Sequence, residues 1–148
     1  MVIKNMAGHN VVCNDIVFRA SVMERNNMAE QRSVEPMLPL TPGAFHVLLT
    51  LTEGDIHGYG ILKEVARLTN GTVSLSTGTL YAILRRLVSE GMVVEIEGRP
   101  APEQDDERRR YYHLTEFGRR VARAEAERLR EMLALAWDRN LLPKPEGV

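Results

Sequence analysis

The chain has 148 residues, of which 44% are hydrophobic and 26% are charged, and its formal net charge is −1. This length can bury a hydrophobic core, and the composition is ordinary for one globular domain with an appendage. The near-zero charge gives no bulk attraction to nucleic acid, so only a local cluster of basic residues could provide one.

The sequence lacks the features of secretion and of membrane insertion. Cys13 is the only cysteine, which excludes an intramolecular disulfide and is typical of a reducing compartment. The N-terminus lacks the basic-then-apolar pattern of a signal peptide, and no apolar run approaches the length of a membrane span. We therefore expect a cytoplasmic protein without a membrane partner.

Residues 1–36 differ in pattern from the rest of the chain. They hold one short apolar patch, around Val11 to Phe18, without a sustained helical or alternating period. The polar stretch that follows ends in a proline. We interpret 1–36 as a poorly ordered N-terminal tail or the result of a start codon assigned too early, and a partner-binding arm is the alternative.

Two helices are predicted after this tail. The first begins at Thr41 as N-cap and Pro42 as the first helical residue, and it ends at 53–55. The residues His-Gly-Tyr-Gly at 57–60 form a turn into a second helix, which Asn-Gly at 70–71 ends.

A third helix starts at Ser76 and runs to Gly91. On a wheel of 100° per residue, its apolar residues occupy one sector and small residues and arginines occupy the other. The inner sector holds Leu80, Ile83, Leu84, Leu87 and Val88, and the outer sector holds Gly78, Ala82, Arg85 and Ser89, with Arg86 at its margin. The leucines are interpreted as core.

The outer sector favours a helix that enters the major groove of DNA. Small residues let the backbone approach the base edges, and hydroxyls and arginines donate to phosphates and bases. The candidate DNA-binding residues here are Ser76, Thr77, Gly78, Thr79, Ala82, Arg85 and Arg86. The alternative is that Ser76 only caps the helix and the two arginines face solvent.

A β-hairpin is predicted next, with strands at 92–97 and 108–114 and an exposed loop between them. Arg108 and Arg109 are candidate phosphate ligands at the base of the second strand. Four acidic residues in the loop would repel DNA, so the two arginines could equally neutralise them. Alternation in the second strand places Tyr112 and Leu114 on one face, and Tyr111 and His113 on the other.

The last predicted helix covers 116–138 and is capped by Thr115. It carries more apolar surface than a small domain can bury, which predicts a homodimer through a partner helix. The residues assigned to dimerisation are Phe117, Val121 and Ala124 near its start and Leu129, Met132, Leu133, Ala136 and Trp137 later on.

The predicted order of elements is that of a winged helix-turn-helix followed by a long C-terminal dimerisation helix, mainly α with a small β-hairpin. The expected domains are a tail at 1–36, a winged helix DNA-binding domain at 37–115, and a dimerisation helix with a short tail at 116–148. No glycine-rich phosphate loop or nucleophile motif suggests an enzyme, and the four dispersed histidines suggest no metal site. We expect no catalytic residue and no cofactor. A winged helix that binds protein instead of DNA is the competing interpretation.

Three motifs in this order resemble PadR-type transcriptional regulators: H-G-Y-G-I-L-K-E-V at 57–65, G-T-L-Y-A-I-L-R-R-L-V-S-E-G-M-V at 78–93 and R-R-Y-Y-H-L-T-E-F-G at 109–118. The resemblance covers the chain from about Leu38 to the end of the last helix and suggests the branch with a short C-terminal region. It implies a dimeric repressor that binds double-stranded DNA through the third helix and releases it when a small-molecule effector, of unknown identity, or another signal acts on the dimer.

The resemblance also assigns individual residues. It matches Thr79 and Tyr81 to the start of the recognition helix, Tyr59 to the second helix, and Tyr112 and Thr115 to the strand and cap after the wing. The sequence departs from the family at two places, since Gly60 replaces a polar helix-forming residue and the wing tip is acidic. Tryptophan on the last helix stacks on planar ligands in one branch, but dimer packing is the favoured role of Trp137.

Overall fold

The structure is a computed structural model that describes residues 3–4, 10–11, 32–96 and 110–147. The chain divides into two compact units, 1–33 and 34–148. In the first unit, strand β1 (Ile3–Lys4) pairs antiparallel with β2 (Asn10–Val11). The sequence did not predict this pair, because two-residue strands are too short to show alternation. The rest of the predicted tail at 1–31 lies outside the described residues.

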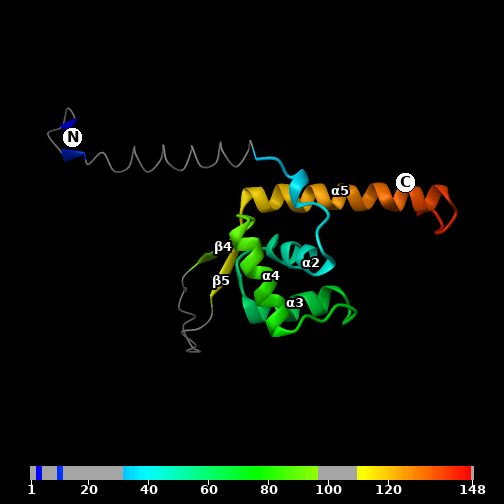
Figure 1. Cartoon of the computed structure of the whole chain (residues 1–148), viewed down its shortest axis with the longest axis horizontal. Helices are drawn as coiled ribbons and strands as arrows, with labels where there is room; N and C mark the ends of the chain where they lie inside the picture. Colours follow the sequence, from blue (N-terminus) through cyan, green and yellow to red (C-terminus); the bar gives the residue numbers. More distant parts are fainter. Residues whose placement is uncertain (1–2, 5–9, 12–31, 97–109, 148) are drawn as a thin grey trace. The chain divides into compact units, whose positions relative to one another are not determined.

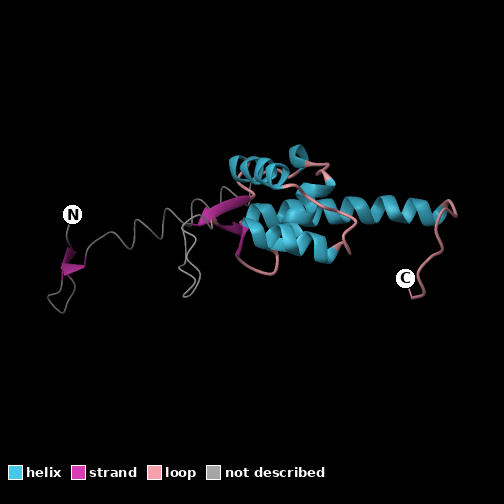
Figure 2. Ribbon diagram, turned by 90° about the horizontal axis from the view of Figure 1, so that it is seen from below, coloured by secondary structure: helices cyan, strands magenta, loops and turns pink. Residues whose placement is uncertain are grey.

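The second unit contains the winged helix. In chain order its elements are η1 (Glu35–Met37), α2 (Pro42–Leu51), β3 (Ile56–His57), α3 (Gly58–Leu68), α4 (Thr77–Ser89), β4 (Val93–Ile96), β5 (Tyr111–Leu114) and α5 (Glu116–Asp138). Helices α2, α3 and α4 lie together beside the strands, and α5 runs past α2 (Figures 1 and 2). The predicted fold class, a mainly α winged helix-turn-helix with a long C-terminal helix, is confirmed.

Side-chain caps fix where the helices begin. Thr41, Ser76 and Thr115 each accept a hydrogen bond through the hydroxyl oxygen from the amide three residues on, as the sequence predicted. His57 does the same for α3 through Nδ1, which lies 3.0 Å from the Gly60 amide nitrogen. Each cap satisfies one of the amides that an α-helix leaves unpaired at its start.

The sheet has three strands where the sequence predicted a two-stranded hairpin. Its order is β3-β5-β4, and all pairs are antiparallel. Strand β3 pairs Ile56 with Tyr112 and His57 with Tyr111. It was missed because two residues carry no period of their own. The position of β3 also explains why residue 60 is glycine, because a Cβ atom there would come within 2.6 Å of the Ile56 side chain.

The core lies where α2, α3, α4 and the sheet meet. The predicted core leucines of α4 are buried, each at most 1% exposed, and they are Leu80, Leu84 and Leu87. Val88 is not part of this core, because it is 37% exposed. It lies at the edge of the apolar sector, where it lines an open pocket between α4 and the sheet.

Helix α5 is divided between the core and solvent. Phe117 and Val121, which the sequence assigned to dimerisation, are 3% and 0% exposed. That assignment is wrong for both residues, because the first turns of α5 pack on the winged core of their own chain. Beyond Glu125 the helix extends past α2 and its side chains become exposed (Figure 1). Among the described residues, no helix is both long and apolar enough to span a bilayer.

Candidate nucleic-acid interface

The first turn of α4 presents small, exposed side chains. Thr77 and Gly78 are exposed, and nothing within 4 Å would meet a Cβ atom added to Gly78. Ser76 Oγ lies 2.8 Å from Thr79 Oγ1 and accepts a hydrogen bond from the Thr79 amide. The hydroxyls of Ser76 and Thr79 are therefore engaged with each other, while the backbone at Thr77 and Gly78 is open to a close approach.

The two arginines of α4 differ in their surroundings. Arg86 Nε lies 3.1 Å from a carboxylate oxygen of Glu90, one turn further along the helix. Arg85 is exposed and makes no hydrogen bond or ion pair with any residue that the structure describes. An exposed guanidinium without a carboxylate can bind phosphate or guanine, so Arg85 is the more available of the two side chains for such a contact.

Tyr81 and Ala82 are also exposed on α4. The Tyr81 ring covers the start of α3, where a Cβ atom on Gly58 would lie 2.9 Å from its hydroxyl oxygen. Tyr81 remains 38% exposed. The missing side chain at Gly58 thus lets Tyr81 lie across both helices of the helix-turn-helix.

Aromatic side chains surround the start of α3 as well. The ring of His57 lies 6.5 Å from that of Tyr59 and 5.7 Å from that of Tyr111. Lys63 Nζ lies 4.6 Å from the centre of the Tyr59 ring, a cation–π contact on a tyrosine that is 56% exposed. His57 has a structural role here, because its Nδ1 caps α3.

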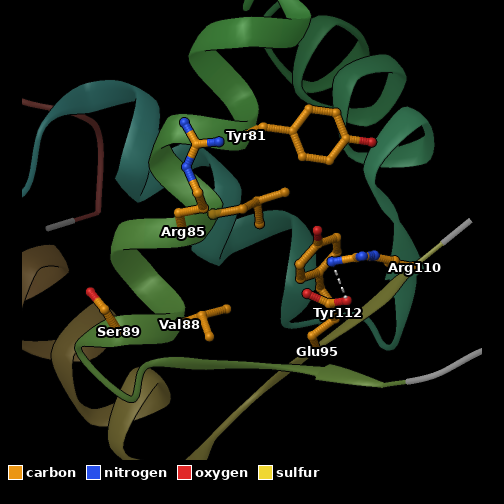
Figure 3. Close-up of a pocket in the computed structure, with 8 residues that line it drawn as sticks. Tyr81, Arg85, Val88, Ser89, Glu95, Arg110 and Tyr112 are labelled. Carbon is orange, nitrogen blue, oxygen red and sulfur yellow. Dashed lines mark ion pairs between the residues drawn. The ribbon is translucent and has the colours of Figure 1, made fainter. Parts of the chain in front are cut away.

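A pocket of about 480 Å³ separates α4 from the sheet. Its walls are Tyr81, Leu84, Arg85, Val88 and Ser89 from α4, Glu95 from β4, and Arg110 and Tyr112 from β5 (Figure 3). Arg110 Nη1 lies 3.0 Å from Glu95 Oε1. Arg108 and Arg109, the predicted phosphate ligands, lie outside the described residues.

Sequence reasoning missed Glu95 and Val88 as members of this site. The register pairs Glu95 with Tyr112, so their side chains share the face that continues from the core into the pocket. Alternation had placed Tyr112 and Leu114 on one face without assigning that face to the core, and both residues are 4% exposed. Burial and the nearby Glu95 carboxylate raise the pKa of the Tyr112 phenol, which favours its protonated form.

The second half of α5 carries the exposed apolar surface. Leu129, Leu133 and Met132 are 39%, 39% and 55% exposed, and Ala136 and Trp137 follow on the same stripe with partial exposure. Ala124 is half-buried at the boundary. Where the structure describes the chain, no group of His, Cys, Asp and Glu side chains is placed to hold a metal ion.

The profile of the transcriptional regulator PadR-like family matches residues 47–124. The chain belongs to this family. The matched part runs from α2 through the wing to the first turns of α5, and it leaves out the exposed half of that helix. The comparison with curated proteins found no match.

Solved structures of transcriptional regulators share the fold. A transcriptional regulator from Clostridium thermocellum is 25% identical, with a TM-score of 0.57 over 69% of this chain and 90% of that chain. A PadR family transcription regulator from Clostridium difficile R20291 is 22% identical, with a TM-score of 0.57 over 69% of this chain and 100% of that one. The chain is therefore a member of a family of transcriptional regulators.

Proposed function

We propose that this PadR-like protein is a cytoplasmic repressor that binds a palindromic operator as a homodimer and releases it in response to a signal. The observation that carries the DNA contact is the exposed face of α4, where Gly78 leaves open space and Arg85 has no ionic partner among the described residues. With Ser76, Thr77, Thr79, Tyr81, Ala82 and Arg86, these residues would contact the major groove. Arg108 and Arg109 would contact a flanking phosphate.

The unpartnered stripe of α5 supports the dimer. Leu129, Met132, Leu133, Ala136 and Trp137 recur at helical spacing on a segment that extends beyond its own core. Burying such a stripe against its symmetry mate removes apolar surface from water, at about 25 cal/mol per Å². A two-fold dimer would place two copies of α4 roughly 34 Å apart, one turn of DNA.

A link between α5 and the wing supports regulation through the dimer. The Thr115 hydroxyl oxygen lies 2.7 Å from the Gly91 carbonyl oxygen and 3.0 Å from that of Met92. The start of α5 is thus tied to the end of α4 and the start of β4. A small molecule or other signal that rotates α5 against its partner would change the spacing of the two α4 helices and release the operator.

The test is titration of the full-length protein onto DNA from upstream of its own coding region, at two salt concentrations, with footprinting. We expect a palindromic footprint, a dimer by sedimentation at micromolar concentration, and an affinity that falls linearly in log salt. A monomer that binds the same site with full affinity would contradict the dimer.

A winged helix that binds protein is the second candidate. The net charge of −1 and the acidic residues at 103–107 favour it, because both weaken attraction to DNA. The salt titration separates the two functions, since a protein-binding module would show no slope from phosphate neutralisation on any duplex.

A further inference from the structure

Tyr112 places an unpartnered hydroxyl in the pocket between α4 and the sheet. The residue is 4% exposed, and its hydroxyl makes no hydrogen bond with any residue that the structure describes. The hydroxyl is not sealed inside the core, because Tyr112 lines the pocket and its ring lies between Glu95 and α4 (Figure 3). The hydroxyl therefore opens into the pocket and can donate a hydrogen bond to a group that enters it.

The charges around the pocket define the chemistry of that partner. Arg85 and Arg110 contribute two positive charges, and Glu95 contributes one negative charge. The phenol of Tyr112 is protonated at neutral pH, as any tyrosine is, and burial and Glu95 raise its pKa further, so it can donate a hydrogen bond. Two guanidinium groups and a phenol suit an anion with several acceptor oxygens, and a phosphodiester is such an anion.

We propose that this pocket receives a phosphodiester group of one DNA strand, which accepts a hydrogen bond from Tyr112 and pairs with Arg110. The inference rests on the proposed DNA-binding function and extends it to the strand beside α4. The pocket volume of about 480 Å³ leaves room for the sugars that flank the phosphate.

Glu95 is a positioning residue in this arrangement. Its carboxylate holds Arg110 at 3.0 Å, and the side chain of Arg110 is 69% exposed. A guanidinium has five N–H donors, so Arg110 can keep Glu95 and still donate to a phosphate. The negative charge of Glu95 also repels phosphate, which limits the affinity of the pocket for DNA of any sequence.

The first test substitutes the phenol. Tyr112→Phe removes only the hydroxyl, and Tyr111→Phe is the matched control on the neighbouring residue, which does not line the pocket. The probe is a duplex that the wild-type protein selects from a random pool. We expect Tyr112→Phe to bind this duplex three- to tenfold more weakly, with an unchanged melting temperature, and Tyr111→Phe to bind it as the wild type does.

The second test neutralises the carboxylate. Glu95→Gln leaves Arg110 without its ionic partner, and Glu127→Gln is the control, because Glu127 forms a comparable exposed ion pair with Arg130 on α5. We expect Glu95→Gln to bind a random-sequence duplex about three- to tenfold more tightly and to steepen the log–log salt slope by up to about one. The ratio of selected to random affinity should fall. Glu127→Gln should change none of these.

Three results would overturn the proposal. One is wild-type affinity in Tyr112→Phe, and another is weaker binding of random duplex by Glu95→Gln. The third is a melting-temperature shift by inorganic phosphate or dAMP that Tyr112→Phe abolishes, because the pocket would then be a site for a free phosphate. If the wild-type protein selects no duplex, the DNA-binding function itself fails. If it selects one that every pocket variant binds equally, only the pocket assignment fails.

Discussion

Helix α4 begins after Ser76 with Thr-Gly-Thr, and α5 begins after Thr115 with Glu-Phe-Gly. In both, a hydroxyl caps the helix and a glycine occupies the first turn. At Gly118 a Cβ atom would overlap the carbonyl oxygen of Met92, whereas at Gly78 it would meet nothing within 4 Å. Packing of α5 on its own chain therefore requires the glycine at 118, whereas nothing in the described part of the chain requires the glycine at 78. A surface that binds an external partner should show this difference.

The largest effect is expected at Gly118. Gly118→Ala forces a methyl group into a backbone carbonyl that Thr115 also holds by hydrogen bonds, so neither group can move easily. We expect a loss of about 2 to 3 kcal/mol in the free energy of unfolding. Urea denaturation at fixed protein concentration measures it. Unchanged stability would mean that the start of α5 can shift away from the Met92 carbonyl at little cost.

Arg85→Ala should give the next largest effect, on binding alone. The side chain is exposed and has no ionic partner among the described residues, so its removal leaves stability within about 0.5 kcal/mol of the wild type. We expect binding to the selected duplex to weaken by about 1 to 3 kcal/mol. Arg86→Ala is the matched control with a smaller expected loss, because Glu90 already holds Arg86. Equal losses would remove the distinction between the two arginines.

Acid should lower the free energy of unfolding through Glu125, a buried residue on α5. Glu125 is 2% exposed, and its carboxylate accepts two hydrogen bonds from Arg128 and one from the Leu40 amide. The Arg128 hydrogen bonds lower its pKa below 4.5, so its contribution to stability is complete above pH 4.5 and is lost as the pH falls through the lowered value.

We expect Glu125 to account for about 1 to 2 kcal/mol of the stability lost between pH 7 and pH 3. Denaturant titrations at both pH values measure this loss, and Glu125→Gln should make it smaller. A pH profile of Glu125→Gln that parallels the wild type would exclude Glu125 as its source.

The sequence predicted most of the helical framework because its signals are local. Thr41, Ser76 and Thr115 mark helix starts by chemistry that needs no distant partner, and the leucines of α4 repeat at helical spacing. The pocket was beyond prediction because it depends on register: Glu95 meets Tyr112 only once β4 and β5 are paired. Phe117 and Val121 were misassigned because a period shows which residues share a face but not whether that face meets its own core or a partner.

Gly78→Ala is the smallest expected change and the most direct test of the comparison. Alanine is the better helix former by up to about 1 kcal/mol, and the structure offers no clash to offset that gain. The variant should therefore unfold at the same or a slightly higher urea concentration than the wild type. Its affinity for the selected duplex should fall severalfold, because a methyl group would keep the α4 backbone away from the base edges.

Greater stability together with weaker binding would show that glycine is kept here for a partner and not for the fold. Loss of stability in Gly78→Ala would instead place Gly78 with Gly118, as a residue that its own chain requires.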